Sequence, residues 1–136
     1  MIRIIASMML CVLVFSTGCG HGLDYTTKVT GTVTVNGKPA NGFYVVFNPP
    51  KGRPANGTTD SQGRFSLSTF DPGDGAVLGE HVVTITDAFP QGPPPMGRIT
   101  ANMSRVPPIY SAVSTTPLKA TVKDDETNDF TFDLKQ

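Results

Sequence analysis

Cysteine and tryptophan are scarce in this chain of 136 residues. It contains no Trp, and its two cysteines are Cys11 and Cys19. Because both cysteines lie near the amino terminus, the rest of the chain cannot form an internal disulfide even in an oxidising compartment. Packing alone must therefore stabilise the folded part of the protein.

An excess of charge of one sign is also missing. Eleven basic residues balance eleven acidic residues, giving a formal net charge of +0. No positive field is present to attract a phosphate backbone, so we expect no nucleic-acid partner. No apolar run after Phe15 is long enough for a membrane helix, and no later segment has the apolar spacing of a helix. The 14 Gly and 12 Pro instead favour a turn-rich, all-β domain.

The amino-terminal residues have the pattern of a secretory signal. Arg3 is followed by an apolar run over residues 4–15 and by the small residues 16–18. This run is too short to span a bilayer as a stable helix, and its charged start and small-residue end are typical of an export signal. We therefore expect the mature protein to be extracytoplasmic.

The residues before Cys19 resemble the lipobox of bacterial lipoproteins, in which the cysteine is lipidated and becomes the new amino terminus. Thr17 and Gly18 are small, as in that motif, whereas Ser16 stands where an aliphatic residue is usual. The resemblance implies a lipoprotein signal peptide at residues 1–18, lipidation of Cys19, and a membrane as partner. The alternative is an ordinary signal peptide that leaves Cys19 unmodified.

The remaining residues predict one domain of the size of a single core. We expect an anchor cysteine and short spacer at 19–27 and one β-sandwich at 28–136, with a long Pro/Gly-rich loop at about 88–108. Alternating apolar and polar residues predict strands at 28–35, 43–47, around Phe65 and Leu67, at 79–86, at 118–122 and at 130–134. Turns are expected at Asn36-Gly37, 60–63 and 124–128, and surface loops at 51–57 and 71–75. About seven short strands with regular turn signals predict an all-β, Greek-key sandwich.

Several of these motifs also resemble a known family. Gly31-Thr32-Val33 with residues 36–40, then 45–47, 59–65 and 79–85, are similar to the carboxypeptidase regulatory-like, transthyretin-like domain. The similarity covers most of residues 28–87, and the whole chain resembles small planctomycete lipoproteins of this type. It implies a transthyretin-like (prealbumin-like) sandwich and no particular activity, because strand and turn geometry explain each motif.

Few residues are candidates for chemistry. The histidines are His21, close to Cys19, and His81, at a strand position where the resemblance implies an aromatic residue. We expect His81 to pack with one ring nitrogen hydrogen-bonded. The acidic residues Asp71, Asp74 and those at 124–126 lack the ligand spacing of a calcium-binding loop and are interpreted as solvated turn carboxylates.

The other charged and proline-rich features need no ligand to explain them. Lys51, Arg53, Arg98 and Arg105 are scattered through expected loops, and Pro93-Pro94-Pro95 is as consistent with a stiff spacer as with a recognition segment. We predict no catalytic, cofactor-binding or metal-binding residue, and Cys19 as the one site of modification.

The sequence therefore predicts a non-catalytic, membrane-anchored lipoprotein that serves as a structural or binding module of the cell envelope, with an envelope protein or a polysaccharide as possible partner. A carbohydrate-binding module is an alternative, in which Tyr25, Tyr44 and Tyr110 would supply the aromatic platform in place of Trp. A small enzyme that uses the 88–108 loop as a lid is a third hypothesis.

Overall fold

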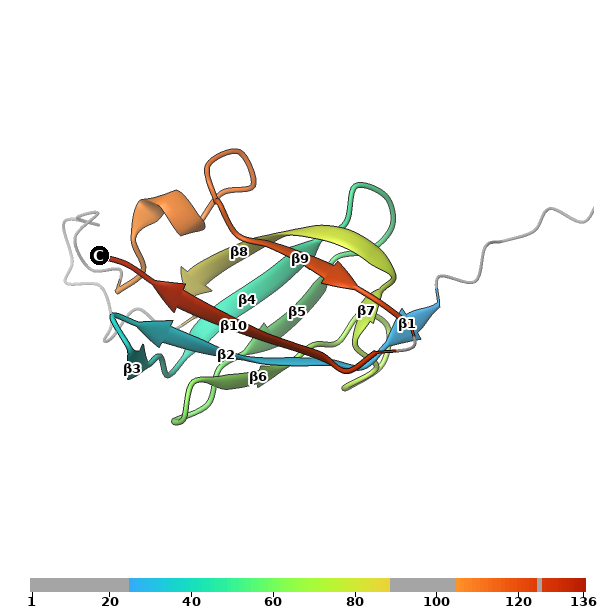
Figure 1. The fold of residues 1–136 in the computed structure, drawn as a ribbon, viewed down its shortest axis with the longest axis horizontal. Coiled ribbons are helices and arrows are strands. Elements are labelled where there is room, and N and C mark those ends of the chain that lie inside the picture. Colours follow the sequence, from blue (N-terminus) through green and yellow to red (C-terminus); the bar gives the residue numbers. More distant parts are fainter. Residues whose placement is uncertain (1–24, 89–104, 125) are drawn as a thin grey trace, which may run out of the picture.

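A computed structural model describes residues 25–88, 105–124 and 126–136. All regular elements in this part are β-strands except one short 3-10 helix (Figure 1). The strands are β1 (Thr26–Thr27), β2 (Val29–Val35), β3 (Lys38–Pro39), β4 (Phe43–Asn48), β5 (Ala55–Thr58), β6 (Arg64–Ser66), β7 (Ala76–Val77), β8 (Gly79–Asp87), β9 (Lys119–Val122) and β10 (Asn128–Leu134), and the 3-10 helix is η2 (Pro108–Tyr110). None of the described helical residues forms a segment long and apolar enough to cross a membrane.

Two four-stranded sheets form the body of the domain. One has the order β5-β4-β8-β9 and is antiparallel throughout. In the other, β2 pairs with β10, β3 and β6, while β1 and β7 form a small separate ladder. Buried side chains of both four-stranded sheets belong to one core, so the domain is an all-β sandwich, as the sequence predicted. The strand predicted at 43–47 is part of β4, which lies between β5 and β8 in its sheet.

The core centres on the Phe47 ring. Its centroid lies 5.6 Å from that of Phe130, 6.1 Å from that of Phe132 and 6.3 Å from that of Phe65, at the tilted or edge-on angles that aromatic pairs favour. Gly31 faces this cluster, and a Cβ there would lie 2.4 Å from the Phe65 ring. The lack of a side chain at Gly31 therefore leaves room for the Phe65 ring.

Two predicted turns have the backbone geometry that their residues favour. Asn36 and Gly37 take φ values of +49° and +81° and close the hairpin between β2 and β3. The Asp60 carboxylate accepts hydrogen bonds from the backbone N–H groups of Gln62 at 2.8 Å and Arg64 at 3.0 Å. This second turn does not close a hairpin, because β5 and β6 belong to different sheets.

Three expected irregular segments contain ordered structure. Residues 55–58 form β5 instead of a surface loop, since pairing with β4 overrides the loop-like composition Ala-Asn-Gly-Thr. Thr26–Thr27 of the expected spacer pairs with β7. Val106, expected within the long loop, is 3% exposed and belongs to the core. The parallel pairing of β10 with β2 was also not predicted.

The strand registers define two ends of the sandwich. The near end holds β1, β7, the loop at 49–54 and the loop at 68–75; the far end holds Gly42, Asp87 and Gln136. In Figure 1 the near end lies at the right and the far end, with the carboxyl terminus, at the left. The seven residues of β2 run from one end toward the other and span about 23 Å.

Candidate functional site

The far end of the sandwich carries a pocket of about 310 Å³. Its polar lining comes from the β2–β3 hairpin, the turn before β4, and two later segments of the chain. The side chains used below are Asn36, Lys38, Asn41, Phe43, Arg105 and Gln136. The pocket therefore lies where residues from distant parts of the sequence converge.

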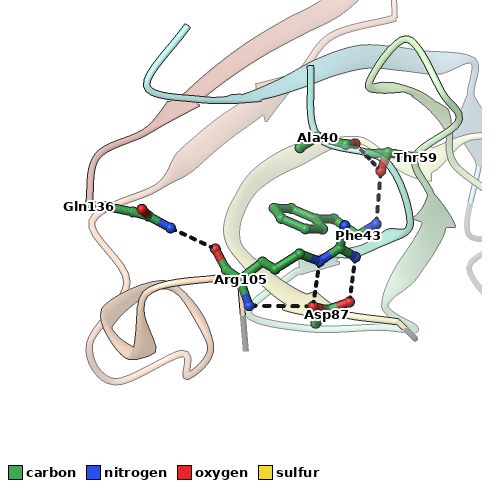
Figure 2. A network of polar contacts seen from close by, with 6 residues as sticks. All are labelled: Ala40, Phe43, Thr59, Asp87, Arg105 and Gln136. Carbon is green, nitrogen blue, oxygen red and sulfur yellow. Dashed lines mark hydrogen bonds and ion pairs between the residues drawn. The ribbon is translucent and has the colours of Figure 1, made fainter. Parts of the chain in front are cut away.

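Arg105 is held in this pocket by a two-pronged ion pair. Its Nε donates to Oδ2 of Asp87 at 2.9 Å and its Nη2 donates to Oδ1 at 2.8 Å (Figure 2). The Arg105 side chain is 40% exposed and that of Asp87 only 6%. This fork geometry fixes the plane of the guanidinium group and is available to Arg but not to Lys.

The Phe43 ring forms the floor beneath this ion pair. The guanidinium carbon of Arg105 lies 4.9 Å from the ring centroid, within the range of a cation–π contact. Phe43 is the first residue of β4 and is opposite Asp87 in the register with β8. Strand pairing therefore brings the carboxylate and the ring to one place, where Arg105 can bind both.

Buried polar contacts fix the start of β4. The Thr59 hydroxyl accepts a hydrogen bond from the Phe43 N–H at 2.9 Å and donates to the carbonyl of Ala40, as Figure 2 shows. Thr59 is 3% exposed, so this hydroxyl satisfies two backbone groups that water cannot reach. On the other side, the Gln136 side-chain amide donates to the Arg105 carbonyl at 3.2 Å.

The pocket combines two cations, the fixed guanidinium of Arg105 and the ammonium of Lys38, with neutral amides. Hydrogen bonding to Asp87 raises the pKa of Arg105 above its ordinary value, and partial burial opposes this rise. Asp87 uses its carboxylate on Arg105, whereas Asn36, Asn41 and Gln136 carry amide groups that both donate and accept. Such a lining can bind hydroxyl, amide or carboxylate groups of a ligand.

Catalytic chemistry finds little support in the described residues. Within 25–88, 105–124 and 126–136, no group of three or more His, Cys, Asp or Glu side chains could hold a metal ion. Among the described residues that line the pocket there is no Ser, Cys or His that could act as a nucleophile or base.

Comparison of the chain with family models, with curated proteins and with solved structures finds no match. The site must therefore be interpreted from its own geometry.

His81 packs within the sandwich, in agreement with its expected role. It is 1% exposed, its ring lies 5.6 Å from that of Phe47, and its Nε2 is 2.7 Å from the carbonyl of Val77. Its Nδ1 is buried and has no hydrogen-bond partner among the described residues. His81 therefore lies outside the far-end pocket and joins the aromatic core.

Two of the acidic residues considered as metal ligands, Asp74 and Glu126, bond to nearby residues of their own loop or turn. The Asp74 carboxylate accepts hydrogen bonds from the N–H groups of Thr69, Phe70 and Asp71 at 2.7, 2.9 and 3.1 Å. Partial burial would raise the pKa of Asp74, but these hydrogen bonds outweigh it and lower the pKa below its ordinary value. In the last turn, Glu126 forms an exposed ion pair with Lys123 at 3.6 Å.

The three tyrosines do not form one platform. Tyr25 precedes β1 at the near end and is 61% exposed, Tyr44 lies in β4 and is 37% exposed, and Tyr110 is 8% exposed. The Tyr110 hydroxyl accepts a hydrogen bond from the N–H of Lys135, so it is used within the fold. A carbohydrate site would have to use other groups.

Several predicted features lie outside the described residues. They are Cys19, His21, Arg98 and Pro93-Pro94-Pro95. Of the other basic residues, Lys51 is exposed, and Arg53 lies with its guanidinium carbon 5.7 Å from the Phe70 ring centroid.

Sequence reasoning missed the pairing of Arg105 with Asp87. It treated Arg105 as one of several scattered loop cations, whereas the side chain organises the far-end pocket. No local spacing indicates the pair, because the two residues are 18 positions apart. The one available signal was that Asp87 directly follows the predicted strand at 79–86, where a carboxylate ends an otherwise apolar and Thr-rich run.

Proposed function

We propose that this protein is an extracytoplasmic lipoprotein, anchored through Cys19, whose β-sandwich is a non-catalytic module that presents the far-end pocket to a partner in the cell envelope. The signal-like residues 1–18 and the small residues before Cys19 support export and lipidation. The transthyretin-like resemblance is part of the same proposal.

One observation carries this proposal. The first strand of the domain begins at Thr26, seven residues after Cys19, and lies at the near end, while the pocket around Arg105 lies at the far end. A tether through Cys19 would hold the near end closest to the bilayer. The sandwich would then point the pocket away from the membrane, where an envelope partner can reach it.

The lipid anchor is tested by the intact mass of the mature protein isolated from its native membranes, together with detergent-phase partitioning beside Cys19→Ala. We expect cleavage before Cys19, a mass increase equal to a diacylglyceryl group, and loss of detergent partitioning in the variant. A water-soluble product with an unmodified thiol at Cys19 would contradict the anchor and favour a freely secreted domain.

A polysaccharide is the second candidate partner, favoured by the amide groups of Asn36, Asn41 and Gln136 in the pocket lining. Side-chain amides donate to and accept from the hydroxyl groups of sugars. A glycan array should give a signal that Asn41→Ala weakens, with Asn56→Ala, an exposed Asn in β5 that does not line the pocket, as matched control. No signal above background would leave a protein partner as the remaining candidate.

A further inference from the structure

Three large apolar side chains are exposed at the near end. Tyr25 is 61% exposed, Phe70 50% and Leu78 42%. They come from the residue before β1, the loop after β6, and the residue between β7 and β8. Because Thr26 is opposite Val77 in the β1–β7 ladder, Tyr25 and Leu78 occupy neighbouring positions at the end of that ladder. We call Tyr25, Phe70 and Leu78 the near-end apolar surface.

Phe70 is held at this end by a tightly bonded loop. The Thr69 hydroxyl donates to the Gly75 carbonyl at 2.7 Å, and the Asp74 carboxylate accepts from the N–H groups of Thr69 and Phe70. Gly75 packs directly on the chain that follows Tyr25, because a Cβ at Gly75 would lie 1.8 Å from the Thr27 carbonyl oxygen. The exposed ring of Phe70 is therefore held by a fixed backbone beside β1.

We propose that the near-end apolar surface rests on a lipid bilayer, with Tyr25, Phe70 and Leu78 in its interfacial layer. This inference depends in part on the proposed function, which supplies the anchor at Cys19. Only five residues separate Cys19 from Tyr25, and the six steps of chain between these two residues can span at most about 20 Å. The chain that leads to the bilayer thus ends beside this surface, and burial of its apolar area in the interface is favourable.

The charges at the near end make this contact mainly hydrophobic. Basic and acidic side chains are both present among the described residues there: Lys28, Lys51, Arg53 and Lys123 against Asp71, Asp74, Glu80, Asp124 and Glu126. With no excess of basic groups, the surface gains little from anionic headgroups. Binding to neutral phosphatidylcholine vesicles is therefore expected, with little change at high salt.

The absence of Trp allows a direct test, because one introduced Trp is the sole indole in the chain. The full-length protein carrying Phe70→Trp is purified from membranes and reconstituted into phosphatidylcholine vesicles with brominated acyl chains. Ile109→Trp is the matched control, because Ile109 is also 50% exposed but lies in η2, toward the far end. The position of η2 follows from the hydrogen bond between the Tyr110 hydroxyl and the N–H of Lys135, next to Gln136. We expect emission at shorter wavelength and severalfold greater quenching for Trp at position 70. Leu78→Trp repeats the measurement should Phe70→Trp fail to fold.

Equal quenching at positions 70 and 109 overturns the inference. A concentration-dependent dimer would also overturn it if Trp at position 70 were shielded from solvent but not quenched by brominated lipid. In that case a second copy of the chain would cover the surface. The mass of the mature protein separates this inference from the proposed anchor. A lipidated Cys19 without quenching at position 70 refutes the surface contact alone. Quenching at position 70 with an unmodified Cys19 supports the surface contact and refutes the anchor.

Discussion

Removal of the Arg105–Asp87 ion pair tests whether the far-end pocket is built as described. The perturbation is a double-mutant cycle of Arg105→Ala, Asp87→Ala and the double variant. Arg105 loses two hydrogen bonds to the carboxylate and its contact with the Phe43 ring. Asp87, whose side chain is 6% exposed, loses its guanidinium partner.

The magnitude follows from the exposure of the two groups. Charge-assisted hydrogen bonds contribute about 1.5–3 kcal/mol each when fully desolvated, but the 40% exposure of Arg105 allows solvent screening, so the pair is discounted to about 1.5 kcal/mol. The contact with Phe43 adds about 0.5–1 kcal/mol. Loss of the guanidinium from this largely buried carboxylate costs about 1 kcal/mol more. We expect Arg105→Ala to lower the free energy of unfolding by about 3 kcal/mol and Asp87→Ala by about 2 kcal/mol. The double variant should lose only about 2.5 kcal/mol, because it no longer carries the carboxylate.

Urea denaturation measures each variant, with circular dichroism as the signal. The expected coupling energy is the difference between the sum of the single effects and the double effect, about 2.5 kcal/mol. Arg105→Lys should retain less than half of this coupling, because an ammonium group cannot form the fork or stack on the ring. A coupling energy below about 0.5 kcal/mol would refute the reasoning, since the contacts would then be those of an ordinary surface pair.

Three further substitutions test other parts of the fold. Phe132→Asp puts a carboxylate at a position that is 7% exposed and should lower the free energy of unfolding by about 3–5 kcal/mol. An unchanged melting temperature would show that the inward face of β10 is misassigned. Gly75→Ala forces a Cβ against the Thr27 carbonyl at a φ of +94° and should destabilise the near end. Gly73→Ala is the control for positive φ alone, because nothing lies within 4 Å of its Cβ. Equal melting temperatures for the two variants would contradict the packing of this loop. Hydrogen bonds from Lys135, from the Gly37 N–H and from Thr34 lower the pKa of Asp133 to about 2, so its stabilisation is present above about pH 4 and is lost as the pH falls toward about 2. Asp133→Asn should therefore flatten the fall in melting temperature across this acidic window, and an unchanged acid profile would exclude Asp133 as a contributor.

Alternation of apolar and polar residues predicted the strands that have one buried and one solvated face. In β2, the residues Val29, Gly31 and Val33 are buried while Thr30, Thr32 and Thr34 between them are partly exposed. The same pattern identified β8, where His81, Val83 and Ile85 are buried. Period-two burial is a local property of the chain, so the sequence alone is enough to find it.

Strands created by pairing could not be found in this way. β1, β3 and β7 have two residues each, too few for any periodicity, and they exist because a neighbouring strand binds them. The composition of β5, Ala-Asn-Gly-Thr, is typical of a loop, yet its backbone pairs with β4 from Phe47 to Tyr44. Tertiary context decides such segments, since strand propensity depends on what the strand packs against.

The far-end pocket was beyond local sequence analysis for a similar reason. Phe43 was predicted as part of a buried strand, and Asp87 follows directly after another predicted strand. Their proximity depends on the β4–β8 register, which places Phe43 opposite Asp87. Arg105 then reaches both groups from a segment 18 positions after Asp87. The chemistry of each residue was visible in the sequence, but their convergence is a result of the fold.

The parallel pairing of β10 with β2 has a consequence for function. Because both strands run from the near end to the far end, the chain enters the sandwich beside Tyr25 and finishes at Gln136, which contacts the Arg105 carbonyl. The near-end apolar surface and the far-end pocket are thus separated by about the 23 Å length of β2. Substitutions that far apart, with no shared partners, have additive effects. Under the proposed anchor and partner, variants of Phe70 should change membrane contact without changing the pocket. Variants of Arg105 should change partner binding without releasing the domain from the bilayer. A strong energetic coupling between the two ends would contradict this separation and would require the sandwich to transmit a change along its whole length.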